Sequence, residues 1–259
     1  MAITVRVLGF PITIGLAFPA FLLLLGYISR FAGIYLAIWV VFGTAAILLH
    51  ELGHALAFRR YGLESSIRFW TLGGLAVPND QEAAAKLPDR QMLVVALAGP
   101  CVGLVLGAAG LALEPVVAGQ SPDVRFAVGM WIFVNMGWGI FNLLPIAGLD
   151  GGHVLMHLTM VALGERGRVI ALGASIVSSA LVAALAIETG YLYIAAIAIL
   201  FGLANPYQYR ALLDALFPGR AERRRQRDAE SSEPLSRRHG FEDDPGPAWP
   251  DGDDREPGS

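Results

Sequence analysis

The chain has 259 residues, of which 55% are hydrophobic and only 16% charged, and its formal net charge is −3. Soluble domains carry roughly 25% charged residues, so this composition excludes an ordinary soluble protein and indicates an integral membrane protein. With this charge balance we expect no nucleic-acid partner.

Six apolar segments follow one another along the chain, and each approaches the ~20 residues that a helix needs to cross a bilayer. The fourth is interrupted near Asn142 and Pro145, and the sixth is short. We therefore expect an all-α polytopic membrane protein with about six transmembrane helices. The segments cover residues of about 8–29, 34–58, 91–113, 124–146, 168–187 and 190–205.

The composition changes abruptly at Pro218. The last 42 residues contain eight Arg and eleven Asp or Glu but few large apolar side chains. Such a segment cannot bury enough apolar surface to offset the entropy cost of ordering. We expect a transmembrane domain over residues 1–210, followed by a juxtamembrane segment and a disordered charged tail over 211–259.

Basic residues are distributed unevenly between the two sides that six spans would define. One side receives eight before the tail, whereas the opposite loops hold only Arg30 and Arg125. Because basic loops stay in the cytoplasm, we expect both termini to be cytoplasmic. The eight residues are Arg6, Arg59, Arg60, Arg68, Lys86, Arg90, Arg166 and Arg168.

The second apolar segment contains His50-Glu51-Leu52-Gly53-His54. On a helix this spacing puts two imidazoles on one face, able to share a zinc ion, beside a Glu that can take a proton from water. Charged and polar side chains in hydrocarbon are costly and usually functional. The alternative is a buried polar cluster that stabilises helix packing.

A third metal ligand would come from Asp150, which follows the broken end of the fourth segment. Two His and one carboxylate leave the fourth zinc position open, as in catalytic sites. With the predicted topology, His50, His54 and Asp150 all fall in the cytoplasmic leaflet. The alternative is that Asp150 only caps the following helix.

These two motifs, HELGH in a helix and NLLPIAGLDGG beginning at Asn142, resemble the site-2 protease family of intramembrane zinc metalloproteases. The resemblance covers about residues 5–210. It implies one Zn²⁺ per chain held by His50, His54 and Asp150, with Glu51 as general base. It also implies that Asn142 helps to hold the substrate peptide or the oxyanion.

The stretch from Phe69 to Val77 resembles the family's glycine-containing strand that re-enters the membrane after the second span. We expect a short re-entrant β segment there. The pair Gly73-Gly74 would then take part in binding substrate, because an edge strand can capture an unwound peptide by β-augmentation. Ala98-Gly99-Pro100 also resembles a family element. We expect neither the PDZ domain nor the CBS pair that many relatives carry.

The sequence thus predicts a zinc endopeptidase that cleaves a transmembrane-helix substrate in regulated intramembrane proteolysis, in a cell membrane that we expect to be prokaryotic. Membrane-tethered transcription regulators, anti-sigma factors and signal-peptide remnants are the family's substrate classes. The alternative function is a non-enzymatic membrane metal-binding or metal-transport protein. His153 and His157, four residues apart, either form a second metal site or have no special role.

Overall fold

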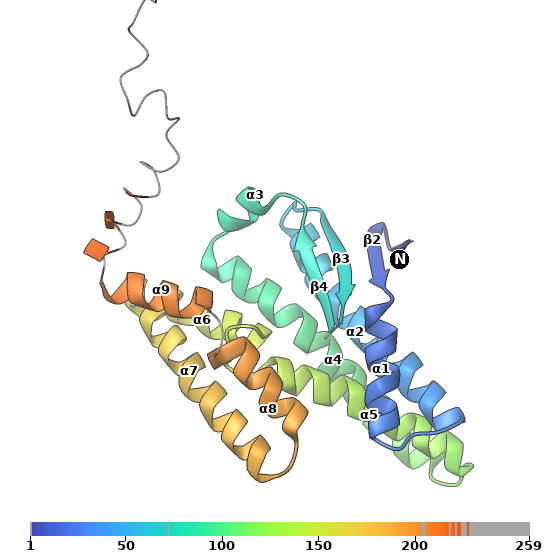
Figure 1. Ribbon diagram of the computed structural model, residues 1–259. Coiled ribbons are helices and arrows are strands. Elements are labelled where there is room, and N and C mark those ends of the chain that lie inside the picture. The colour runs from blue at the N-terminus through green and yellow to red at the C-terminus, as the bar shows by residue number, and fades with distance from the viewer. Residues whose placement is uncertain are drawn as a thin grey trace, which may run out of the picture. The chain divides into compact units, whose positions relative to one another are not determined.

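The computed structural model describes residues 2–71, 73–203, 206–217, 219–220, 222–223 and 227. Helices dominate it, and four strands form one small sheet (Figure 1). The helices are α1 (Ala17–Ile28), α2 (Ile34–Arg60), α3 (Gln81–Ala85), α4 (Asp89–Val117), α5 (Pro122–Asn142), α6 (Asp150–Leu163), α7 (Glu165–Glu188), α8 (Leu192–Ala198), the π-helix η1 (Ile199–Leu203) and α9 (Pro206–Leu216). The strands are β1 (Ala2–Val7), β2 (Phe10–Gly15), β3 (Ser65–Trp70) and β4 (Gly73–Pro78).

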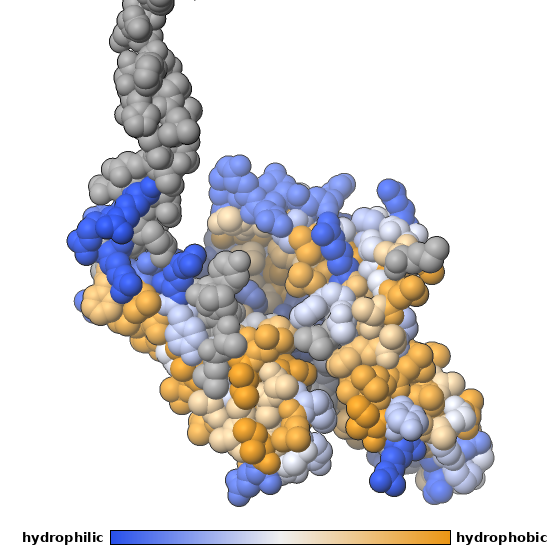
Figure 2. All heavy atoms as spheres, viewed as in Figure 1, coloured by the Kyte–Doolittle hydropathy of each residue, from blue (hydrophilic) through white to orange (hydrophobic). Residues whose placement is uncertain are grey.

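Four helices in the described part of the chain are long and apolar enough to cross a membrane, namely α2, α4, α5 and α7. They coincide with the second to fifth predicted segments, and α5 ends at Asn142, where the interruption was expected. Figure 2 shows apolar side chains over α7, α8 and α1, with hydrophilic side chains around α3. The chain is a multi-pass membrane protein.

The first predicted segment, residues 8–29, is wrong in its first half. Residues 2–15 form the hairpin β1–β2, and α1 begins only at Ala17. Leu8 and Gly9 both have positive φ, 51° and 87°, as the tight turn of a two-residue hairpin requires. Apolar length alone concealed the β-branched run Ile12, Thr13 and Ile14, which favours a strand. The all-α prediction therefore has to be corrected to a helical protein with a four-stranded sheet.

The sixth predicted segment forms the short helix α8, which continues into η1. Neither α1 nor α8 reaches the length of a spanning helix, so the count of six spans is not confirmed. The end of this segment, residues 204–205, and the charged tail lie largely outside the described residues. The domain boundary near residue 210 stays a prediction.

The sheet has the order β1-β2-β3-β4 and packs against α2. Strands β2 and β3 run parallel, whereas β3 and β4 form an antiparallel hairpin in which Ile67 faces Ala76. Sheet and helix share one core, where Ile12, Ile67 and Ala55 are almost fully buried. The predicted segment from Phe69 to Val77 thus covers the end of β3, the hairpin turn and most of β4, which is an edge strand of the sheet.

Helix α4 packs closely on both α2 and α5 through glycines. A β-carbon at Gly53 of α2 would lie 2.8 Å from the carbonyl oxygen of Ala98 on α4. One at Gly103 of α4 would lie 2.9 Å from the carbonyl oxygen of Asn135 on α5. Small residues permit such approach between membrane helices. This packing brings the part of α2 that carries His50 and His54 against Ala98 and Gly99 of α4.

Candidate metal centre

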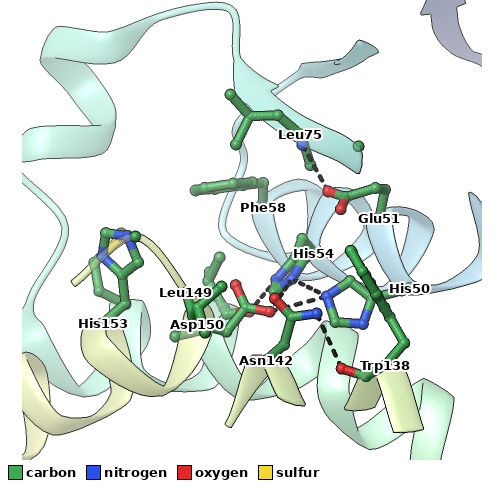
Figure 3. Close-up of a pocket in the computed structure, with 16 residues that line it drawn as sticks. His50, Glu51, His54, Phe58, Leu75, Trp138, Asn142, Leu149, Asp150 and His153 are labelled. Carbon is green, nitrogen blue, oxygen red and sulfur yellow. Dashed lines mark hydrogen bonds and ion pairs between the residues drawn. The ribbon is translucent and has the colours of Figure 1, made fainter. Parts of the chain in front are cut away.

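Three side chains meet where α2 faces the start of α6. Nε2 of His50 lies 2.9 Å from Oδ2 of Asp150 and 3.2 Å from Nε2 of His54, and the latter lies 3.3 Å from the same carboxylate oxygen. In the described part of the chain, this is the one group of three or more metal-ligating side chains close enough to share an ion. Figure 3 shows the three side chains pointing toward one another.

These distances fit a zinc ion. Ligand atoms about 2.0–2.1 Å from a tetrahedral zinc lie about 3.3 Å from each other, close to the spacing found here. Nδ1 of His54 donates to the carbonyl oxygen of Val95 at 2.7 Å, so the Nε2 of a neutral ring carries a lone pair. That lone pair faces a carboxylate and a second imidazole. A cation between them would relieve the repulsion.

Gly99 on α4 supplies the space on the other side of the two rings. A β-carbon there would lie 2.7 Å from Nε2 of His50 and would collide with Nε2 of His54. The Ala98-Gly99-Pro100 element therefore borders the ligand atoms. Apart from the resemblance, no local pattern predicted this position for Gly99.

Asp150 is the first residue of α6, and the residue in the capping position is Leu149. The side chain of Asp150 therefore contacts the two imidazoles instead of capping the helix, which favours the ligand reading. The loop before it is held by Ser175 of α7, whose hydroxyl accepts a 2.8 Å hydrogen bond from the backbone N–H of Ala147. Ser175 is almost fully buried, and sequence reasoning missed it.

Glu51 lies beside this group but is not part of it. One carboxylate oxygen accepts a 2.8 Å hydrogen bond from the backbone N–H of Ala76 on β4. Figure 3 shows the carboxylate turned toward that strand. The residue is 5% exposed, so its carboxylate lies in an enclosed space beside His50 and His54.

A cavity of ≈ 250 Å³ joins the three ligand side chains, Glu51 and β4. Asn142 lines it, with Nδ2 donating to the carbonyl oxygen of Trp138 at 3.0 Å. Gly74 also lines the cavity, whereas Gly73 lies against the Trp138 ring and is not in the lining. The remaining walls are mainly apolar and include Phe58, Leu75, Met92, Val95, Ala96, Trp138 and Leu149.

The two further histidines, His153 and His157, have different surroundings. His153 lines the cavity from α6, with an exposed side chain. His157 pairs instead with Asp89 at the start of α4, at 2.8 Å between Nδ1 and Oδ1. These three side chains do not form a ligand group of their own among the described residues. Asp89 is an acidic partner that sequence spacing did not reveal.

Parts of this chain are similar to a known protein family and to several known proteins. Residues 37–121, which include His50, Glu51 and His54, match the model of peptidase family M50. Rip3 of Mycobacterium tuberculosis, whose name describes a zinc metalloprotease, is 38% identical over 114 residues, or 43% of this chain and 28% of its own length. A zinc metalloprotease of Methanocaldococcus jannaschii is 26% identical over 156 residues, covering 58% of this chain and 43% of that protein.

A solved structure described as a site-2 protease from Methanocaldococcus jannaschii has the same fold. It superposes with a TM-score of 0.55 and 20% sequence identity, over 82% of this chain and 95% of that one. The alignments with the curated relatives, by contrast, span less than half of their length.

Proposed function

We propose that this chain, whose residues 37–121 match peptidase family M50 and whose fold resembles that of a site-2 protease, is an intramembrane zinc endopeptidase that cleaves transmembrane-helix substrates. The observation that carries this proposal is the convergence of His50, His54 and Asp150 at 2.9–3.3 Å beside Glu51. One zinc ion per chain would be held by these three side chains. It would polarise the scissile carbonyl and make water nucleophilic near neutral pH.

The protein's own groups would carry the proton transfers. Glu51 takes a proton from the attacking water and later delivers it to the leaving amine, as general base and then general acid. Asn142 has a second amide N–H besides the one it gives to Trp138, and this group would donate to the substrate's carbonyl oxygen. The apolar walls around Phe58, Met92 and Val95 strengthen these polar interactions by limiting water.

Strand β4 would bind the substrate, because a helical peptide must unwind before its carbonyls can be attacked. Since the N–H of Ala76 points to Glu51 and not to β3, the backbone groups of Gly74 and Ala76 face the free edge of the sheet. An extended peptide added there would run beside the cavity. In a set of substrate peptides that each carry one N-methyl group, cleavage should be lost when the methylated residue is every second one along the strand. An equal loss of cleavage at all positions would contradict strand addition.

The proposed partners are single-pass membrane proteins, such as a tethered transcription regulator, an anti-sigma factor or a signal-peptide remnant. We propose that both termini and the opening of the site face the cytoplasm, supported by the eight basic residues against two. Cysteines introduced at Arg60 and Arg166 should resist an impermeant thiol reagent added to intact cells, after replacement of Cys101. Cysteines at Arg30 and Asp123 should react, and the reverse pattern would invert the orientation.

The decisive experiment is Glu51→Gln. The purified variant should keep about one zinc per chain and lose cleavage of a model transmembrane substrate in detergent. Gln keeps the size of the side chain but cannot take a proton, so retained zinc with lost cleavage separates chemistry from folding. Undiminished cleavage by this variant would refute the proposed function.

A further inference from the structure

Glycine is required at position 74 because of the side chain of Glu51. A β-carbon at Gly74 would lie 2.6 Å from Cγ of Glu51 and 3.1 Å from its Cδ and Oε1. The obstacle is the middle of the Glu51 side chain, which is buried and cannot turn away freely. Real β-carbons essentially never approach so closely, so any larger residue at 74 must push Glu51 aside.

Two residues on, Ala76 holds the end of the same side chain. Its N–H donates to Oε2 of Glu51 at 2.8 Å. Ile67 and Ala76 then form the pair of the β3–β4 hairpin that exchanges no backbone hydrogen bonds. The carboxylate therefore fixes an edge amide that the sheet itself leaves without a partner.

We infer that β4 positions the general base: Gly74 gives Glu51 its space, and the N–H of Ala76 sets the direction of its carboxylate. Gly74 is then a positioning residue for catalysis as well as part of the substrate edge. This inference rests on the proposed function, because it assigns Glu51 the role of base. A substrate strand that pairs with β4 would then also contact the N–H of Ala76, from which Glu51 accepts its hydrogen bond.

The inference predicts a loss of turnover without a loss of substrate binding. Misplacing a catalytic group by about 1 Å costs about hundredfold in rate. Gly74→Ala should therefore lower kcat about hundredfold while KM changes less than threefold and zinc content stays at one per chain. Gly73→Ala adds the same methyl group one residue earlier, where it meets only the Trp138 ring at 3.4 Å. Its effect on kcat should be at least tenfold smaller.

Amide hydrogen exchange at Ala76 supplies a readout that does not depend on activity. Losing one hydrogen bond of about 1.4 kcal/mol corresponds to about tenfold faster exchange. We expect this acceleration in both Glu51→Ala and Gly74→Ala, and not in Gly73→Ala. Exchange unchanged in Gly74→Ala, or an increase in KM with kcat unchanged, would overturn the inference.

Ala76→Pro covers the case in which Gly74→Ala does not fold. Proline is tolerated on an edge strand where the N–H faces outward, and it removes the donor without adding bulk at position 74. It should lower kcat with zinc content and melting temperature preserved; full activity would also overturn the inference. Failure of the proposed function is a separate result, because it appears as persistent cleavage by Glu51→Gln whatever the exchange at Ala76.

Discussion

The three proposed metal ligands come from two regions that are built in different ways. His50 and His54 lie on adjacent turns of the long helix α2, which α4 contacts so closely that Gly53 and Gly99 leave no room for a side chain. Asp150 follows an irregular loop between α5 and α6, where the hydroxyl of Ser175 holds the backbone N–H of Ala147. Close packing therefore orients His50 and His54, whereas a hydrogen bond to the irregular loop orients Asp150.

The difference teaches where the site can tolerate change. A close-packed interior transmits any added atom, because it has no free volume to absorb it. A loop held by single hydrogen bonds loses only a modest free energy when one is removed. Substitutions on the α2–α4 side should therefore damage metal binding more than substitutions that support the loop.

The largest effect is expected from His50→Ala, which removes a ligand outright. Zinc content measured by mass spectrometry of the purified protein should fall from about one per chain to below about a tenth, and cleavage should be lost. His157→Ala provides the control, because His157 pairs with Asp89 outside the ligand group. Equal zinc loss in the two variants would show that the metal is held elsewhere.

Gly99→Ala should come next. The added methyl group collides with Nε2 of His54 and lies 2.7 Å from Nε2 of His50, so the two rings must separate. We expect zinc affinity, measured by competition with a chelator, to fall about hundredfold, at the upper end of effects seen when groups around a metal site are changed. Gly137→Ala on α5, where nothing lies within 4 Å, is the control for adding a methyl group to a helix.

Should Gly99→Ala bind zinc as tightly as Gly137→Ala does, close packing by α4 would not position the two imidazoles. The contrast between the two regions would then be lost.

The smallest effect is expected from Ser175→Ala. Hydrogen bonds between membrane helices contribute about 0.6 kcal/mol on average and at most about 1.7, so zinc affinity should fall about threefold to eighteenfold. Ser179→Ala, one turn along α7, removes a hydroxyl that donates to the backbone of its own helix at the carbonyl oxygen of Ser175. A larger loss in Ser179→Ala than in Ser175→Ala would contradict the role of Ser175 in holding the loop.

The sequence predicted the residues of the site better than their supports. The spacing of His50, Glu51 and His54 is local, since a helix fixes it within two turns, and the spanning helices follow from apolar length. Asp150 needed the broken backbone near Pro145 as a further signal. Ser175, Asp89 and the placement of Gly99 depend on contacts between distant segments, which no local pattern encodes.

The sheet was only half predicted for a similar reason. The Phe69–Val77 stretch was expected to contain a strand because it resembles the family's glycine-containing strand. Strand β2, by contrast, lies within an apolar stretch that also fits a helix, and β1 was not predicted. The parallel pairing of β2 with β3 joins residues about 55 positions apart, as in Ile12 with Ile67. Such pairing is set by tertiary contacts and cannot be deduced from either strand alone.

The hairpin β1–β2 has a consequence for depth in the bilayer. Its outer strand exposes Ala2 to Arg6 along one edge of the sheet, and an open sheet edge is not stable in hydrocarbon because its backbone groups would lack partners. Arg59, near the end of α2, donates to the carbonyl oxygen of Leu8 at 2.7 Å and stacks on the ring of Phe10. The water-facing edge is thereby fastened to the helix that bears His50 and His54. In a bilayer, strand pairing and the apolar length of α2 would together set the depth of these imidazoles relative to the lipid headgroups.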